Sequence, residues 1–224
     1  MPFLSIIVPV FNESRTIADI ISKIDAIPLE KELIIVDDGS TDETGAILRT
    51  QRVPNLKLIH HTSNRGKGAA ILTGLANAGG DLVIIQDADL EYDPADYMKL
   101  IGEIQKGGSD LVLGNRFYSG WKGEFIQRCG NKTLTGMLNA LFGTKIRDCF
   151  TCYKLANRGV IQKLGLKARG FDIEIEFLAR AIRSGLKIKE IPVSYTPRKY
   201  SEGKKISFWD GIGVLCSIVR YRIW

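Results

Sequence analysis

The segment Ile84-Ile85-Gln86-Asp87-Ala88-Asp89-Leu90-Glu91 is the part of this 224-residue sequence around which the rest can be ordered. Its apolar start predicts a buried strand, and its end carries three acids at alternate positions. Since alternate side chains of an extended segment point to the same side, Asp87, Asp89 and Glu91 can converge on one point. Converging carboxylates repel one another unless a cation lies between them, and Mg²⁺ or Mn²⁺ takes such oxygen ligands. A solvated acidic loop is the alternative, and the surrounding sequence decides between the two.

Apolar runs alternate with segments of helical periodicity through the first half of the chain. Strands are predicted at 4–10, 33–36, 56–60, 81–86 and 110–113, and helices at 13–26, 41–50, 66–78 and 94–106. This alternation predicts an α/β fold, in which a mostly parallel sheet is covered by helices on both faces. Ligands of such sheets bind beyond the carboxyl ends of the strands. One sheet edge is therefore expected to hold one site, because polar clusters follow the predicted strands at 11–13, 37–38, 64–66 and 87–89.

The second half of the chain is less regular. Helices are expected at 127–142, 172–184 and 207–221, extended segments at 148–155 and 188–195, and loops at 116–125 and 197–205. The 197–205 loop is basic, and its Tyr-Ser-Glu-Gly sequence would permit a lid that orders when a ligand binds.

The composition, 45% hydrophobic and 25% charged, is that of an ordinary soluble globular protein. No run reaches the roughly 18–20 consecutive apolar residues that span a bilayer, and the N-terminus lacks a signal-peptide pattern. A cytoplasmic protein is therefore expected. Of the four cysteines, Cys149 and Cys152 form a C-x-x-C pair, which is either redox-active, half of a zinc site, or simply buried. Because no second pair or nearby histidine completes a metal site, buried reduced thiols are predicted.

The positive charge is concentrated near the C-terminus. The net charge is +6, and residues 180–224 hold ten Lys and Arg against three Asp and Glu, so the preceding residues are close to neutral. A basic C-terminal segment favours contact with phosphates or with an anionic membrane surface. Nucleic acid is not an expected partner, because its binding needs basic residues along an extended face with interleaved aromatics.

Four stretches, taken together, resemble the family-2 glycosyltransferases of the GT-A fold: 5–13 (Ser-Ile-Ile-Val-Pro-Val-Phe-Asn-Glu), 34–42, 64–68 (Asn-Arg-Gly-Lys-Gly) and 87–91. Two later stretches, 148–154 and 198–206, look like the polyprenyl-phosphate hexosyltransferases, the group that contains dolichol-phosphate mannose synthase. The resemblance covers nearly the whole chain. It implies a Rossmann-like GT-A catalytic domain at 1–206, with a nucleotide-sugar-binding half at 1–114 and an acceptor half at 115–206, followed by an amphipathic helix at 207–224.

The resemblance implies an enzyme that transfers a hexose, with inversion, from a GDP-mannose or UDP-glucose type of donor to a dolichyl or undecaprenyl phosphate. Carried over by position, the nucleotide contacts are Pro9, Phe11, Glu13, Val36, Asp38, Asp87 and Ala88, with Arg198 and Lys204 closing over the diphosphate. For Asp38, the alternative is a turn carboxylate in Asp-Gly-Ser-Thr-Asp, a sequence that caps helices well. Lys67 is interpreted as part of a tight turn before a small-residue helix, and the role of Arg65 stays open.

By the same resemblance, Asp89 and Glu91 bind the Mg²⁺ or Mn²⁺ ion, which stabilises the departing nucleoside diphosphate. Family members often have glutamine in place of Glu91, and an acid there keeps the oxygen ligand. Arg116 matches a family arginine near the diphosphate and the acceptor phosphate, and a planar guanidinium suits such binding. Arg128 is a further candidate for the acceptor phosphate, ahead of Asn131 and Lys132.

A phosphate acceptor is already ionised near neutral pH, so it needs a strong general base less than a hydroxyl does. Glu174 and Glu176 fall near the place where related transferases carry a base. Acids two apart on a helix do not share a face, so at most one should reach the site. Glu176 is preferred as the catalytic carboxylate, in the role of a base, and a supporting role is its alternative.

Two other functions stay open: a family-2 transferase that acts on a sugar or protein hydroxyl, and a non-catalytic nucleotide-sugar-binding protein. The first requires a carboxylate base, and the intact acid set argues against the second. The C-terminal helix, with Trp209, Ile218, Arg220 and Arg222, suits a peripheral position on the cytoplasmic face of a membrane, whereas packing on the core or in a dimer is the alternative. The sequence leaves the sugar, the nucleotide and the oligomeric state open.

Overall fold

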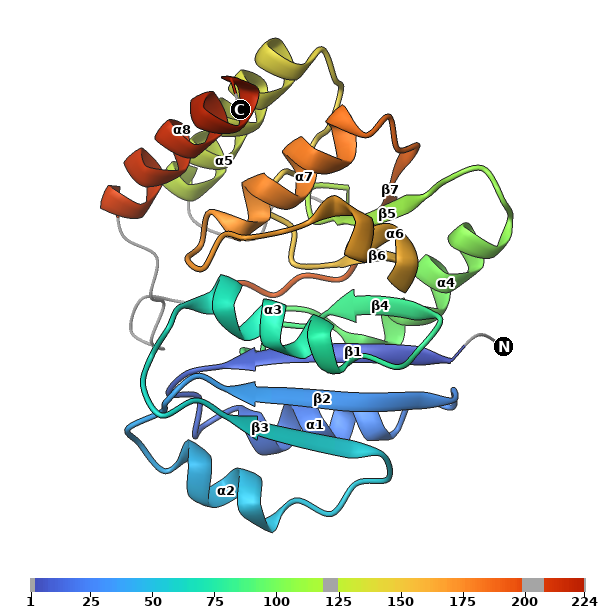
Figure 1. Ribbon diagram of the computed structural model, residues 1–224, viewed down its shortest axis with the longest axis vertical. Helices are drawn as coiled ribbons and strands as arrows, with labels where there is room; N and C mark the ends of the chain where they lie inside the picture. The colour runs from blue at the N-terminus through green and yellow to red at the C-terminus, as the bar shows by residue number, and fades with distance from the viewer. Residues whose placement is uncertain (1–2, 119–124, 199–207, 224) are drawn as a thin grey trace.

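The computed structural model describes residues 3–118, 125–198 and 208–223, with the backbone alone at 125–127 and 208–212. In this part of the chain the strands form one seven-stranded sheet of order β3-β2-β1-β4-β6-β5-β7 (Figure 1). Its strands are β1 (Leu4–Val10), β2 (Lys31–Asp37), β3 (Leu56–His60), β4 (Leu82–Ile85), β5 (Leu111–Asn115), β6 (Lys154–Asn157) and β7 (Ile188–Pro192). All neighbouring pairs are parallel except those of β6, which runs antiparallel to both β4 and β5. The predicted α/β class with a mostly parallel sheet is confirmed.

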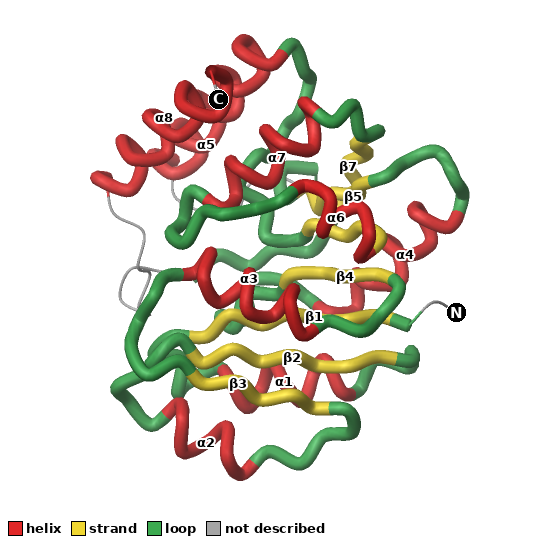
Figure 2. The backbone as a smooth tube through the Cα atoms, viewed as in Figure 1, coloured by secondary structure: helices red, strands yellow, loops and turns green. Residues whose placement is uncertain are grey.

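Helices cover both faces of the sheet, as Figure 2 shows, with α3 in front of the strands and α1 behind them. The helices are α1 (Ile17–Asp25), α2 (Thr44–Thr50), α3 (Lys67–Asn77), η1 (Pro94–Asp96), α4 (Tyr97–Gln105), α5 (Phe125–Phe142), α6 (Arg158–Leu164), α7 (Ile173–Arg183) and α8 (Phe208–Ile223). Helices α5, α7 and α8 pack on one another at the end of the molecule away from β3. Helices α5 and α7 belong to the predicted acceptor half at 115–206, whereas α8 lies in the segment predicted as a separate amphipathic helix.

The strands between the helix layers are apolar on both faces. Ile6, Ile7 and Val8 are consecutive in β1 and completely buried, because neither face of a parallel sheet meets water. Helix α1 buries one stripe, and its members are Ile17, Ile20, Ile21 and Ile24. This i, i+3, i+4, i+7 spacing is the pattern that predicted the helix.

Helix α3 lies unusually close to its neighbours because it is built from small residues. A Cβ added at Gly74 would lie 2.4 Å from the side chain of Ile7 in β1, and one added at Gly68 would lie 2.4 Å from the carbonyl oxygen of Ala168. The second contact joins α3 to the loop between α6 and α7. The amide of Ala69 donates to the carbonyl of Arg169 in that loop (3.0 Å), which fixes the same approach.

The second half of the sheet departs from the sequence-based expectation. The extended segment predicted at 148–155 becomes strand only at Lys154–Asn157, and it inserts antiparallel between β4 and β5. Helix α6 follows it directly and was not predicted. Both features depend on pairing between segments far apart in the sequence, which periodicity within one segment does not record.

Cys149 and Cys152 are buried free thiols, as predicted. Burial raises the pKa of the Cys149 thiol to about 12. At neutral pH both thiols are therefore protonated and poorly nucleophilic. Among the described residues, no helix combines the length and apolar character needed to cross a bilayer.

We expect Gly68→Ala to destabilise the protein by about 1–3 kcal/mol, because the new methyl group meets backbone atoms that only a shift of the 166–172 loop can move. Gly102→Ala in α4 is the matched control: no atom lies within 4 Å of its added Cβ. There the substitution should stabilise by about 0.5–1 kcal/mol, through helix propensity. Urea unfolding measures both values, and equal effects at the two positions would contradict the close packing of α3.

Candidate active site

The polar segments that the sequence singled out do meet at one edge of the sheet. Val10 at the end of β1 lies opposite Asp37 at the end of β2, and β4 runs parallel to β1 on its other side. The chain therefore leaves all three strands at the same edge, toward 11–13, 38–42 and 86–91. This is the carboxyl edge at which α/β sheets bind ligands.

Hydrogen bonds join the first two strand ends. Asn12 has a φ of 53°, a left-handed conformation that asparagine tolerates, and its Oδ1 accepts from the amide of Thr41 (2.8 Å). The amide of Glu13 donates to Oγ1 of Thr44 (2.9 Å). Pro9 and Phe11 are half-buried at this edge. The pocket wall predicted for a nucleotide is thus held in place before any ligand binds.

The carboxylate of Asp38 is engaged within the protein. It is 2% exposed, lies 2.6 Å from Nδ1 of His61, and accepts hydrogen bonds from the amides of Arg65 (3.0 Å) and Gly66 (2.8 Å). These contacts fix the loop before α3, so Asp38 supports the predicted nucleotide pocket by holding this loop in place. Its direct contact with a nucleotide stays a prediction.

Two predicted nucleotide contacts have buried side chains, so for them only backbone contact with a nucleotide stays a prediction. Val36 is completely buried within β2, and Ala88 is 3% exposed. Both side chains are covered by the protein itself, because parallel strands and the turns that follow them pack under helices on both faces. Neither offers side-chain surface to a ligand.

The acid group, Asp87, Asp89 and Glu91, follows β4 through a turn rather than an extended strand, and its members lie close enough for their charges to interact. Leu90 has a φ of 64°, which is rare for a bulky residue and reverses the chain between Asp89 and Glu91. The amide of Glu91 then donates to Oδ1 of Asp89 (3.1 Å). Burial, together with the charges of Asp87 and Glu91, raises the pKa of Asp89 to about 7. A nearby cation would therefore stabilise the ionised form of Asp89.

Glu91 holds the segment 195–198 over the acid group. Its Oε2 accepts from the hydroxyl of Tyr195 (2.8 Å), and its Oε1 accepts from the amide of Arg198 (2.7 Å). The guanidinium of Arg198 forms two bonds with the carboxylate of Glu13 (2.9 and 3.1 Å) and lies 3.4 Å from Oδ2 of Asp89. Arg198 thus lies beside the acid group, and its contact with a diphosphate stays a prediction. Lys204 lies outside the described residues.

Lys67 belongs to the site, contrary to the interpretation of it as a turn residue. Its Nζ lies 2.8 Å from Oδ1 of Asp87 and 2.9 Å from Oε1 of Glu174. Burial acts to lower the pKa of Lys67, but the two carboxylates outweigh it and the pKa is raised. The sequence signal was available: Lys67 is the first residue of α3, and that helix begins at the same sheet edge.

The preference for Glu176 over Glu174 was wrong. Glu176 is 1% exposed, and it accepts from the amides of Lys167 (2.8 Å) and Ala168 (2.6 Å) and from Nε of Arg180 (2.8 Å). Glu174 faces the acid group instead, where it pairs with Lys67 and with the buried Lys154. Two residues along a helix turn the side chain to the opposite face, so the phase of α7 decides which acid faces the site.

Arg116 approaches the site from β5. It forms a two-bond ion pair with the buried Asp148 (Nε–Oδ2 and Nη2–Oδ1, both 2.7 Å), and its guanidinium lies 5.0 Å from the ring centre of Tyr195. Burial acts to raise the pKa of Asp148, but Arg116 outweighs it and the pKa is lowered. From α5, Asn131 donates to Asp148 (3.3 Å), whereas Arg128 is exposed one turn earlier. The role predicted for Arg128 is untested.

Residues 5–165, more than half of the chain, match the sequence profile of glycosyl transferase family 2. The chain belongs to this family. It is therefore a glycosyltransferase, as the motifs predicted.

Two relatives named for transfer to polyprenol or dolichol phosphate align with most of this chain. A polyprenol monophosphomannose synthase of Mycolicibacterium smegmatis is 28% identical over 215 residues, which are 89% of this chain and 79% of that protein. A dolichol-phosphate mannosyltransferase of Pyrococcus furiosus is 31% identical over 211 residues, which are 90% of this chain but 58% of that protein.

A solved structure confirms the GT-A fold. It is a glucosyl-3-phosphoglycerate synthase of Mycobacterium tuberculosis in complex with Mn²⁺, uridine diphosphate and phosphoglyceric acid. Its TM-score is 0.76 at 22% sequence identity, and the match covers 99% of this chain and 78% of the other. At that identity the likeness concerns the fold alone.

The donor set of the glycosyltransferase fits a hard divalent cation. The candidate side-chain ligands are carboxylate oxygens, and burial beside Asp87 and Glu91 raises the pKa of Asp89, which an added positive charge would lower. In the described residues no group of three or more candidate ligands is already assembled. Glu91 is engaged with Tyr195 and Arg198, so Asp89 is the stronger candidate and Glu91 stays a prediction.

We expect the metal-free protein to lose stability as the pH rises from about 4 to about 7 because of Asp89. In the unfolded chain this carboxyl ionises near pH 3.9, whereas in the folded protein its pKa is about 7. Between these two pKa values the folded state binds a proton that the unfolded state has released. The contribution of Asp89 to stability is therefore complete below about pH 3.9 and is lost progressively as the pH rises to about 7.

Asp89→Asn removes this titration. Thermal unfolding in EDTA from pH 4 to 8 should therefore show a smaller decline for the variant than for the wild type. Parallel pH curves for the two proteins would contradict the raised pKa.

Proposed function

We propose that this glycosyltransferase moves a hexose from a nucleoside diphosphate sugar to a polyprenyl phosphate, with inversion and with the help of a divalent cation. Relatives named for polyprenol, dolichol and undecaprenyl phosphate acceptors support the acceptor class. The geometry of the sheet edge supports transfer between a donor and an acceptor bound there, because the acid group faces the cationic side chains of Arg116 and Arg198.

The donor side is built around Asp89. An ion held by Asp89, with Glu91 as the further candidate ligand, would supply Lewis-acid stabilisation of the leaving diphosphate. Arg198, already bonded to Glu13 and close to Asp89, is a cation that can turn from these carboxylates to phosphate oxygens. The half-buried Pro9 and Phe11 would cover the base and the ribose.

The acceptor class follows from how the nearby carboxylates are paired. Burial acts to raise the pKa of Glu174, but the ion pairs with Lys154 and Lys67 outweigh it and the pKa is lowered. Asp148 is held ionised by Arg116, and Asp87 is paired with Lys67. Carboxylates bound to cations in this way are weak bases. This pairing is the single observation that favours a phosphate acceptor, which needs no proton removed, over a hydroxyl.

The transfer itself requires in-line positioning. An oxygen of the acceptor phosphate forms the new bond to the anomeric carbon, while the bond from that carbon to the diphosphate breaks and its electron pair leaves with the nucleoside diphosphate. The guanidinium of Arg116 is held by Asp148 and lies over the ring of Tyr195, and we assign it to the position where the two phosphate groups would meet. It neutralises charge on either side of the reacting carbon.

The proposed acceptor lies in a membrane, and α8 supports peripheral contact at its cytoplasmic face. Val214 and Ile218 of α8 are buried, consistent with its packing on α5 and α7, whereas Val219 and Ile223 are 43% and 73% exposed. Val219→Glu/Ile223→Glu should therefore reduce co-sedimentation with vesicles that contain anionic lipid and leave the unfolding midpoint unchanged. Unaltered co-sedimentation would contradict contact between α8 and the membrane surface.

A transfer assay tests the proposed reaction. GDP-mannose and UDP-glucose, each with Mg²⁺ or Mn²⁺, are offered together with a short polyprenyl phosphate or with a sugar acceptor that presents only hydroxyl groups. We expect product with the lipid phosphate alone. Transfer to the hydroxyl acceptor alone, or to neither acceptor, would overturn the proposal.

Three variants locate the chemistry. Asp89→Asn should lower turnover at least roughly 100-fold through loss of the metal ligand. Asp93→Asn is the matched control, because Asp93 is exposed just beyond the acid group and caps η1, which asparagine also does. Glu176→Gln should keep turnover within roughly tenfold, since Glu176 bonds the 167–168 backbone; an enzyme that uses Glu176 as its base would lose activity entirely.

A further inference from the structure

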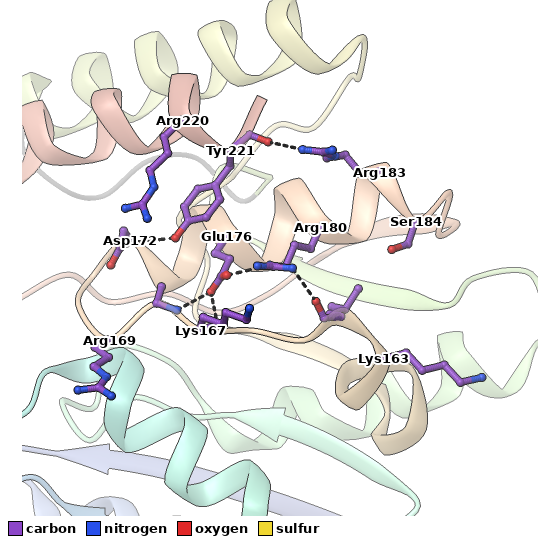
Figure 3. A pocket seen from close by; sticks show the side chains of 12 residues that line it. Lys163, Lys167, Arg169, Asp172, Glu176, Arg180, Arg183, Ser184, Arg220 and Tyr221 are labelled. Atoms are coloured by element: carbon purple, nitrogen blue, oxygen red, sulfur yellow. Dashed lines mark hydrogen bonds and ion pairs between the residues drawn. The ribbon is translucent and has the colours of Figure 1, made fainter. Parts of the chain in front are cut away.

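A second concave site lies on the side of α7 that Glu176 faces. It is a hollow of about 930 Å³ between α6, the loop 165–172, α7 and the last turn of α8 (Figure 3). Its lining is strongly basic, with two acids, Asp172 and Glu176, against six cations: Lys163, Lys167, Arg169, Arg180, Arg183 and Arg220. None of these cations contributes to the contacts of the acid group described above.

Both acids of the hollow are already satisfied. Glu176 is bonded to two backbone amides and to Arg180, and Asp172 accepts from the hydroxyl of Tyr221 (3.3 Å). Burial, with the nearby charge of Glu176, raises the pKa of Tyr221 to about 12, which keeps this hydroxyl a donor. The excess positive charge of the hollow is therefore not neutralised by its own wall.

Among the described residues, three of the cations have no side-chain hydrogen bond, ion pair or cation–π contact, whereas Arg220 lies over the ring of Tyr221. The side chains of Lys163, Lys167 and Arg169 form no hydrogen bond or ion pair with any residue that the structure describes. They extend from α6 and from the loop that follows it. Like charges gathered in a concavity raise the local potential and attract anions from solution.

The walls of the hollow are held in fixed positions. Arg183 donates to the backbone carbonyl of Tyr221 (3.2 Å), which ties the end of α8 to α7. On the opposite wall, the carbonyl of Arg169 accepts from Ala69 of α3 (3.0 Å). The cationic groups are thus carried on backbone that does not need to rearrange when a ligand enters, which lowers the entropic cost of binding.

We propose that this hollow is a binding site for a phosphate group, distinct from the donor and acceptor sites and additional to the proposed function. Arginines give planar, two-bond contacts to phosphate oxygens, and lysines add compact charges around them. The phosphate belongs either to the headgroup of an anionic lipid or to a free phosphate ligand. The two sources share the same recognition chemistry.

The test compares two double variants that lose equal charge. Lys163→Gln/Lys167→Gln removes two unpaired cations of the hollow, and Lys23→Gln/Lys189→Gln removes two exposed lysines from α1 and β7, which do not line it. Each protein is titrated calorimetrically with inorganic pyrophosphate in EDTA. Each is also sedimented with phosphatidylcholine vesicles that do or do not contain phosphatidic acid. All four lysines are exposed, so circular dichroism and the unfolding midpoint should match the wild type.

We expect the hollow variant to lose roughly tenfold in affinity for at least one probe, whereas the control variant stays within about twofold of the wild type. A loss confined to phosphatidic acid vesicles assigns the site to a lipid headgroup, and a loss confined to pyrophosphate assigns it to a free ligand. Equal losses in both variants, or no binding of either probe by the wild type, overturn the proposal. Failure here leaves the transfer assay unaffected, because the hollow variant keeps every residue of the acid group.

Discussion

The partly buried ammonium group of Lys67, held between the carboxylates of Asp87 and Glu174, joins the first and second halves of the chain. Asp87 follows β4 and Lys67 begins α3, whereas Glu174 lies on α7 and pairs again with the buried Lys154 of β6. Removing Glu174 would leave the charge of Lys154 buried and uncompensated, a change that typically costs about 3–5 kcal/mol. The relative position of the two halves therefore depends on this set of charges.

The same arrangement sets the electrostatics of the candidate active site. Lys67 neutralises one carboxylate of the acid group, and Arg198 pairs with Glu13 while it approaches Asp89. Burial, and then the charges of Asp87 and Glu91, keep the pKa of Asp89 raised. In the proposed reaction, a divalent cation and a diphosphate would replace the contacts that Arg198 makes with Glu13 and Asp89 at this edge. The close packing of α3 on β1 and on the 166–172 loop keeps the edge fixed during such an exchange.

Helix α7 separates two environments that the sequence treated as one. Its Glu174 face belongs to the acid group, and its Glu176 face belongs to the basic hollow under the end of α8. The acidic pair at alternate positions was thus informative, since one acid does reach the site, but the phase of the helix could not be fixed from the sequence. A helical pattern gives relative angles between side chains. The absolute orientation comes from tertiary contacts, here the ion pairs of Glu174 with Lys67 of α3 and Lys154 of β6.

The sequence by itself determined the alternation of strands and helices, the sheet edge at which polar segments gather and the family to which the chain belongs. These features rest on local periodicity and on short motifs whose spacing survives in the linear order. Only the tertiary structure decided the antiparallel insertion of β6, the burial of Val36 and Asp38, the recruitment of Lys67 and the choice of Glu174 over Glu176. Each of these depends on contacts between segments distant in the chain, where burial and ion pairing select one of several arrangements that the same local pattern permits.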